Sequence, residues 1–106
     1  MTTYVTYGLP DEPLQDLLQR LSTALHIELT SHESSYRGVY FRSGSTGGEH
    51  FILQPNFLAH EDEWIDDEHQ EFPFLLYVNE TERQDEIHRL LEGEIPAIVK
   101  LKSEDL

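Results

Sequence analysis

The chain has 106 residues, no cysteine, and 21 acidic against 7 basic residues, which gives a formal net charge of −14 with histidine neutral. This length fits one domain around a single hydrophobic core. The charge argues against nucleic acids and anionic membranes as partners, since both are bound through Lys and Arg. The lack of cysteine excludes disulfides, thiolate zinc sites and cysteine nucleophiles.

The chain begins with a predicted strand and a predicted helix. Residues 2–7 are β-branched and aromatic, a composition typical of strands. Asp11 is the expected N-cap of the helix, and Pro13 lies in its first turn. Apolar residues then recur at helical spacing and form one face, at Leu14, Leu17, Leu18, Leu21 and Leu25.

Three further strands are predicted before the middle of the chain. Residues 26–31 alternate between polar and apolar types, and residues 36–42 and 49–54 are rich in strand-forming residues. The glycine-rich residues 43–48 between the last two predict a polar hairpin loop. Because no Lys follows this loop and it leads into a strand, it lacks the requirements of a phosphate-binding loop. His50 is expected to be a structural or edge residue of its strand.

The second half predicts a long loop, a strand, a helix and a last strand. The acidic residues 58–73 show no periodicity and predict a surface loop. Residues 74–78 are apolar throughout, as in a central strand. Thr81 and Gln84 form a potential capping box for a helix that ends at Gly93.

Residues 97–101 predict the last strand, and the polar residues 103–106 are expected to fray. The predicted order is β-α-β-β-β-β-α-β. We expect a single α+β domain over residues 1–106, with a mostly antiparallel sheet of about five to six strands and two helices. No apolar run could span a membrane and no signal peptide is recognisable, so a soluble, cytoplasmic protein is expected.

The negative charge is concentrated in the second half of the chain. Residues 1–53 contain 6 acidic and 3 basic residues, a net of −3, whereas residues 54–106 contain 15 and 4, a net of −11. Between residues 58 and 72 there are seven acidic residues and no Lys or Arg. A local excess of this kind favours cations and basic proteins as partners.

The same stretch contains potential metal ligands. His60, Asp62, Asp66 and His69 lie within ten residues, and a transition metal accepts imidazole and carboxylate together. The spacing matches no known metal motif, and a stretch with so many carboxylates produces such a pattern by chance. We therefore predict no metal and no other cofactor, and keep a metal-binding or enzymatic domain using His60, Asp62 and His69 as an alternative.

Catalysis by other routes has little support in the sequence. The clustered carboxylates are expected to be exposed, and exposure removes the desolvation that tunes a catalytic pKa. Four serines lie in predicted loops or at strand ends, and none occupies a nucleophile elbow: Ser34, Ser35, Ser43 and Ser45. We predict that the protein is not an enzyme.

Trp64, the only tryptophan, lies inside the acidic stretch. An exposed aromatic ring surrounded by charge of one sign is typical of a protein-binding hot spot. The alternative is that Trp64 packs into the core and the carboxylates are merely solvated. Mutual repulsion of seven like charges opposes compactness, which favours binding. The predicted partner-binding residues are Glu61, Asp62, Glu63, Trp64, Asp66, Asp67, Glu68 and Glu71.

A small, acidic, cysteine-free α+β protein without a catalytic motif resembles the bacterial immunity proteins of the contact-dependent growth inhibition type. Residues 35–41, 52–56 and 75–79 carry the likeness. The resemblance implies a protein that neutralises a toxin domain, often a basic nuclease, by covering its substrate cleft. It implies no particular site residues, because such families bind through variable surfaces. A third possibility is an adaptor that binds another basic protein.

Overall fold

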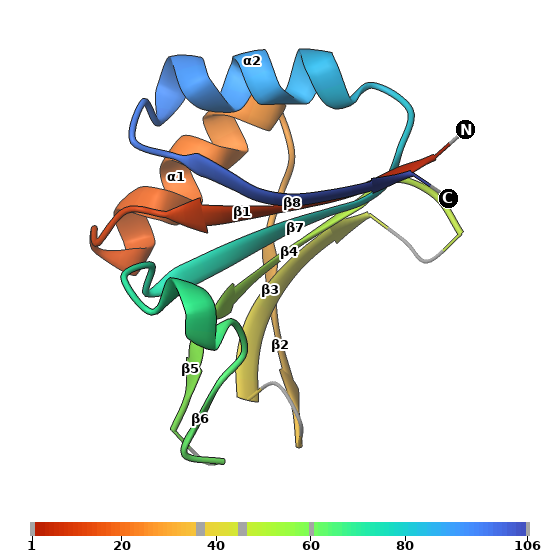
Figure 1. Ribbon diagram of the computed structural model, residues 1–106. Helices are drawn as coiled ribbons and strands as arrows, with labels where there is room; N and C mark the ends of the chain where they lie inside the picture. Colours follow the sequence, from red (N-terminus) through yellow and green to blue (C-terminus); the bar gives the residue numbers. More distant parts are fainter. Residues whose placement is uncertain (1, 36–37, 45–46, 60, 106) are drawn as a thin grey trace.

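The computed structural model describes residues 2–35, 38–44, 47–59 and 61–105. Its main element is a six-stranded antiparallel sheet in the order β2-β3-β4-β7-β1-β8, and two α-helices lie on one side of it (Figure 1). The predicted α+β class, the antiparallel sheet and both helices are confirmed. The elements are β1 (Thr3–Leu9), α1 (Leu14–Leu25), β2 (Thr30–Ser34), β3 (Gly38–Gly44), β4 (His50–Pro55), β5 (Phe57–Leu58), β6 (Glu63–Trp64), η1 (Asp67–His69), β7 (Phe74–Thr81), α2 (Gln84–Glu94) and β8 (Val99–Asp105).

The hydrophobic core lies between the helices and one face of the sheet. Alternate residues of β1 point into it, and the leucine face of α1 covers them. The two helices also pack against each other. The buried side chains that join these elements include Val5, Tyr7, Leu9, Leu17, Leu21, Leu53, Leu76, Ile87 and Leu91. In the described residues, no helix is long and apolar enough to cross a membrane.

The start of α1 and the strand after it differ from the prediction. The helix begins at Leu14 with Pro13 as its N-cap and no side-chain capping bond, so Asp11 is not the cap. The Pro13 carbonyl accepts the first bonds, because proline has a suitable φ of −56°. His26 ends the helix in the left-handed conformation, so the predicted strand 26–31 begins only at Thr30.

The predicted capping box of α2 is wrong. Arg83 is the N-cap and Gln84 is already helical, whereas Thr81 ends β7 and its hydroxyl accepts from the Arg83 backbone N–H. Gly93 does not end the helix, which continues to Glu94 with Ile95 as its C-cap. Ile95 is fully buried and its N–H donates to the Leu91 carbonyl, which fixes the end of the helix at this point.

The C-terminal residues are ordered as an edge strand. β8 pairs antiparallel with β1 as far as Asp105, so residues 103–105 are not frayed, while Leu106 lies outside the described residues. Ser103 donates its hydroxyl hydrogen to Oε1 of Gln84, which ties this strand to α2. His50 is buried on β4 between β3 and β7 and is therefore structural but not at an edge.

Candidate protein-binding surface

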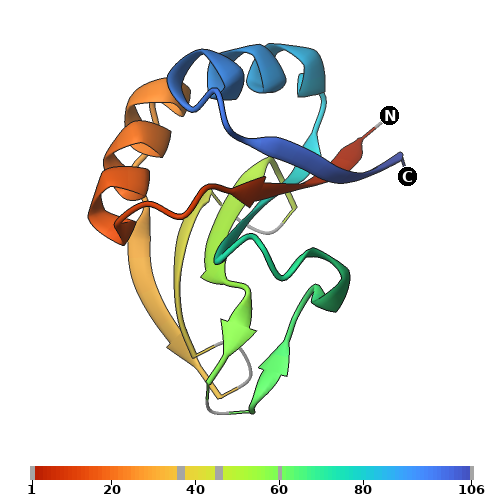
Figure 2. The ribbon, with the colours of Figure 1, turned by 60° about the vertical axis from the view of Figure 1, so that its left-hand side comes forward.

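The acidic stretch in the middle of the chain folds into a distinct unit on the side of the molecule away from the helices (Figures 1 and 2). We call residues 57–72 the acidic segment. It consists of a short hairpin of β5 and β6, in which Phe57 faces Trp64 and Leu58 faces Glu63, followed by the 3-10 helix η1. The predicted long loop without regular structure is therefore wrong, because the segment has its own strand pairing.

One buried asparagine holds the acidic segment to the end of β4. Asn56 is fully buried, and its side-chain Nδ2 donates to the carbonyl oxygens of Asp66 (3.3 Å), His69 (3.0 Å) and Phe72 (3.0 Å). Its Oδ1 accepts from the backbone N–H of Asp66 (2.8 Å), and its backbone carbonyl accepts from Ile65 (2.7 Å). These bonds satisfy partly buried backbone groups of the segment, in addition to the backbone bonds from the His69 N–H to Asp66 and from the Phe72 N–H to His69.

The end of the segment packs closely on β1. A Cβ atom built on Gly8 would lie 2.5 Å from Cγ of Phe72, so the phenyl ring occupies the space that only a glycine leaves open. Beside this contact, a hollow of about 310 Å³ separates the segment from the sheet; its lining includes Ile65, Asp66 and Lys102. The segment is thus anchored at one end and open to solvent at the other.

Two of the ligand-type side chains in the segment bind each other. Oδ2 of Asp66 accepts from Nδ1 of His69 (2.8 Å), and Oδ1 of Asp66 accepts from the backbone N–H of Glu68 at the start of η1. Both side chains are about one-third exposed or less. Asp66 and His69 therefore stabilise the segment itself and contribute less to an interaction surface than their charges suggest.

Five other carboxylates of the segment are available to a partner. Among the residues that the structure describes, five acidic side chains of the segment form no ion pair, and all five are exposed: Asp62, Glu63, Asp67, Glu68 and Glu71. Asp62 lies in the hairpin turn with a φ of +52°, a conformation that aspartate tolerates better than most residues. Unpaired like charges at this density create a local negative potential.

The hairpin also presents an aromatic pair. The rings of Phe57 and Trp64 are tilted at 57° with centroids 5.1 Å apart, and Phe57 remains 37% exposed while Trp64 is half-buried. Trp64 therefore neither enters the core nor stands free in solvent. A tilted aromatic pair on a short hairpin, with unpaired carboxylates in the same segment, has the composition of a protein-binding hot spot.

All eight residues predicted for partner binding lie in this one segment, although Asp66 has a structural role within it. Sequence reasoning did not assign Phe57 to this surface and missed the role of Asn56. The signal for Asn56 was a polar residue between Pro55 and two apolar residues, at the point where the strand had to end.

The structure provides no metal cluster to support the alternative. Within residues 2–35, 38–44, 47–59 and 61–105, no three His, Asp or Glu side chains gather as metal ligands do. His60 lies outside the described residues, so the full predicted set of His60, Asp62 and His69 is not tested and stays a prediction.

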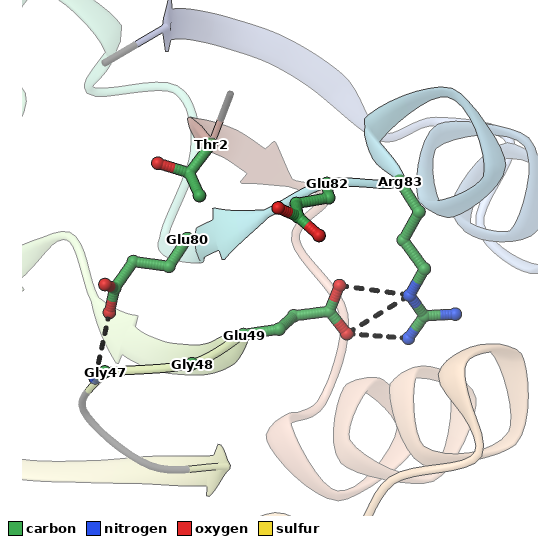
Figure 3. Close-up of a pocket in the computed structure, with 7 residues that line it drawn as sticks. All are labelled: Thr2, Gly47, Gly48, Glu49, Glu80, Glu82 and Arg83. Carbon is green, nitrogen blue, oxygen red and sulfur yellow. Dashed lines mark hydrogen bonds and ion pairs between the residues drawn. The ribbon is translucent and has the colours of Figure 1, made fainter.

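A second acidic region lies at the other end of β7, in an open hollow of about 550 Å³ (Figure 3). Here Glu49 accepts a bidentate pair of bonds from Arg83, with its Oε1 2.7 Å from Nη2 and its Oε2 3.0 Å from Nε, and a further bond from the Thr81 hydroxyl (2.7 Å). The Arg83 guanidinium holds the pKa of Glu49 below its usual range, helped by Thr81 and opposed by partial burial. In return, Glu49 and Glu86 raise the pKa of Arg83.

The glycine-rich loop contributes to the same hollow. The Gly47 N–H donates to Oε2 of Glu80 (3.2 Å), and Nδ1 of His50 donates to the Gly48 carbonyl (2.8 Å). A backbone N–H that is already bonded to a carboxylate does not attract a phosphate. Residues 45 and 46 lie outside the described residues, so the prediction about phosphate binding by the whole loop stays a prediction. Glu49, Glu80 and Arg83 all have structural partners in the hollow.

The buried tyrosine of the core is structural as well. Tyr7 shares a hydrogen bond of 3.3 Å with Nδ1 of His88 and stacks on its ring. Burial, with a smaller contribution from Glu92, raises the pKa of Tyr7 to about 12, so its hydroxyl stays protonated.

We find no match of the chain to known protein-family models, and no curated protein matches it.

Proposed function

We propose that the protein binds a basic protein partner through the acidic segment. The observation that carries the proposal is the Phe57–Trp64 pair, one ring of which is 37% exposed, on a hairpin in which the exposed Asp62 and Glu63 form no ion pair with the described residues. Aromatic rings supply the buried contact in such interfaces, while the charges raise the association rate and select basic partners.

The partner that fits best is a toxin domain that the protein neutralises, as immunity proteins do. Support comes from the acidic segment and from the small acidic α+β domain that carries it. A basic toxin such as a nuclease has a Lys- and Arg-rich cleft for phosphates, and the carboxylates of Asp67, Glu68 and Glu71 would occupy that cleft in their place. Inhibition would then be steric and electrostatic, and the protein itself would perform no chemistry.

The test is a charge reversal that spares the structural residues of the segment. The variant Asp67→Lys/Glu68→Lys/Glu71→Lys leaves Asp66, His69 and Asn56 in place. The matched control carries the same change in net charge at exposed acidic positions elsewhere, as Asp11→Lys/Asp85→Lys/Glu94→Lys.

Each protein is immobilised as the full chain and exposed to a lysate of the source cell, and captured proteins are identified and then purified. We expect one basic protein to bind the natural chain and the control at least about a hundredfold more tightly than the segment variant, as for hot-spot charges at other interfaces. Salt should lower the association rate more than it raises the dissociation rate.

Immunity needs a second measurement. The captured protein should kill cells when it is expressed alone, and co-expression of the natural chain, but not of the segment variant, should restore growth. Equal capture by all three proteins would exclude the acidic segment from the interface. A captured protein that is not toxic would favour the adaptor alternative.

A further inference from the structure

The two edges of the main sheet differ in how they are protected against pairing with another strand. The β8 edge carries Lys100 and Lys102, and its register with β1 shifts between Thr6 and Tyr7. Lysines and bulges of this kind discourage edge-to-edge association. β8 is thus a protected edge.

The β2 edge has none of these protections. β2 contains no Pro or Lys, and it pairs with β3 over all five residues without a register shift. It lies at the outer end of the strand order (Figure 1), and its residues 30–33 are exposed. A regular, exposed edge strand of this kind is a template for one more strand.

The distribution of charge indicates which molecule supplies the strand that pairs with the β2 edge. Residues 26–48, which contain β2 and β3, carry two acidic and two basic residues, a net of zero, within a chain of net charge −14. A strongly basic partner gains nothing at this neutral edge. Two copies of an acidic chain, by contrast, repel each other least where they meet through their neutral surfaces.

We propose that two copies of this chain pair through β2, antiparallel and across a two-fold axis at His32, to form one continuous sheet. His32 is the middle residue of β2, so this register gives the longest overlap of the two strands. It also places Ser31 of each copy opposite Glu33 of the other. A register centred on Glu33 would instead place two carboxylates opposite each other, which is unfavourable.

The side chain at the axis is already ordered in the single chain. Nε2 of His32 lies 3.1 Å from the Thr30 hydroxyl, and the ring stacks on Tyr40 with centroids 5.6 Å apart. Because the ring is held in place before pairing, little side-chain entropy is lost when the two copies meet.

Salt should act on this association in the opposite sense to partner binding. The two copies repel through their net charges of −14, and added salt screens that repulsion. The pairing should therefore strengthen with salt. Since only five residues of each copy pair, we expect a weak dimer that forms at high micromolar to millimolar concentration.

The test is sedimentation equilibrium of the full chain over this concentration range, with the variants His32→Asp and His32→Lys. In either variant two like charges meet at the axis, and we expect dimerisation about fivefold weaker. An equimolar mixture of the two variants should restore it, because opposite charges then meet. The matched controls are Val99→Asp and Val99→Lys on the β8 edge, where the side chain is 43% exposed, and they should dimerise like the natural chain.

A natural chain that stays monomeric at millimolar concentration overturns the proposal and leaves this edge for a strand of another protein. Dimerisation that is unchanged in both His32 variants, or that is not restored in their mixture, also overturns it. None of these results bears on the acidic segment, so the two proposals fail independently.

Discussion

The two acidic regions of this protein use the same residue types for different purposes. In the hollow where α2 begins, Glu49 binds Arg83 and Thr81, and Glu80 accepts from Gly47 (Figure 3). In the acidic segment, Asp66 has a comparable role, whereas the five carboxylates of Asp62, Glu63, Asp67, Glu68 and Glu71 have no ion-pair partner among the described residues. A carboxylate is informative about function only after its internal partners have been counted.

The difference arises from what surrounds each region. The hollow lies where β4, β7 and α2 meet, and a basic residue at the N-cap of α2 faces its carboxylates. The acidic segment contains no Lys or Arg at all and is held in shape by an uncharged side chain, Asn56. The segment therefore keeps its structure without neutralising its charges.

The largest effect is expected from removing that uncharged support. Asn56→Ala removes the side-chain donor shared by three carbonyl oxygens of the segment and the acceptor of the Asp66 N–H, and should lower the free energy of unfolding by about 3 kcal/mol. Urea denaturation measures this loss, and faster amide exchange at Ile65 and Asp66 would locate it. The control Asn79→Ala removes one bond to His50 and should cost about 1 kcal/mol. Equal losses in the two variants would show that Asn56 has no special role.

The second-largest effect is expected from disturbing the contact between β1 and the acidic segment. Gly8→Ala forces the Phe72 ring to move and should cost about 2 kcal/mol in unfolding free energy. The control Gly93→Ala, in a helix with open space around it, should instead stabilise the protein by about 0.5–1 kcal/mol. If thermal unfolding ranks the two variants in the reverse order, Phe72 does not anchor the segment in solution.

The hollow should lose part of its stabilising effect in acid. Glu49→Gln weakens the bidentate pair with Arg83 and should cost about 1 kcal/mol at neutral pH. Because the folded protein lowers the pKa of Glu49 from 4.5, this stabilisation is complete above pH 4.5 and is lost as the pH falls through the lowered pKa. Denaturation curves of both proteins should converge in acid, and a difference independent of pH would contradict the assignment.

The smallest effect concerns the unpaired carboxylates. Asp67→Asn/Glu68→Gln/Glu71→Gln removes mutual repulsion and should raise the free energy of unfolding by about 0.5 kcal/mol at low salt, and by less at high salt. Neutralising Asp11 and Glu28, which are exposed acidic residues outside the acidic segment, should change it less. A loss of stability in the triple variant would mean that these carboxylates have structural partners after all.

Much of the fold was predictable because it depends on local patterns. The leucine periodicity from Leu14 to Leu25 identified α1, and the apolar residues 74–78 identified the strand that lies fourth in the sheet. The ends of the elements were less predictable, since tertiary contacts set them. Thr81 resembled a helix cap, but its hydroxyl binds Glu49, which is 32 residues away in the chain.

The position of the acidic segment in the sequence was predictable, but its folded conformation was not. Charge density alone located the segment, since charge is visible in the sequence. The β5–β6 pairing was not visible, because it rests on two residue pairs and on the bonds of Asn56 to backbone groups 10 to 16 residues further on. Every residue has a backbone carbonyl, so the sequence does not show which carbonyls accept the bonds of Asn56.

The position of β1 in the sheet has a consequence for how the chain folds. β1 lies between β7 and β8, so Thr6 has Tyr77 on one side and Lys102 on the other. During synthesis, α1 follows β1 at once, but the strand partners of Val5, Tyr7 and Leu9 are made only much later, since Leu9 pairs with Phe74 and Val5 with Val78 and Ser103. Contacts of such high sequence separation slow folding and prolong the exposure of apolar residues. We expect chaperone binding to newly made chains to occur at this strand.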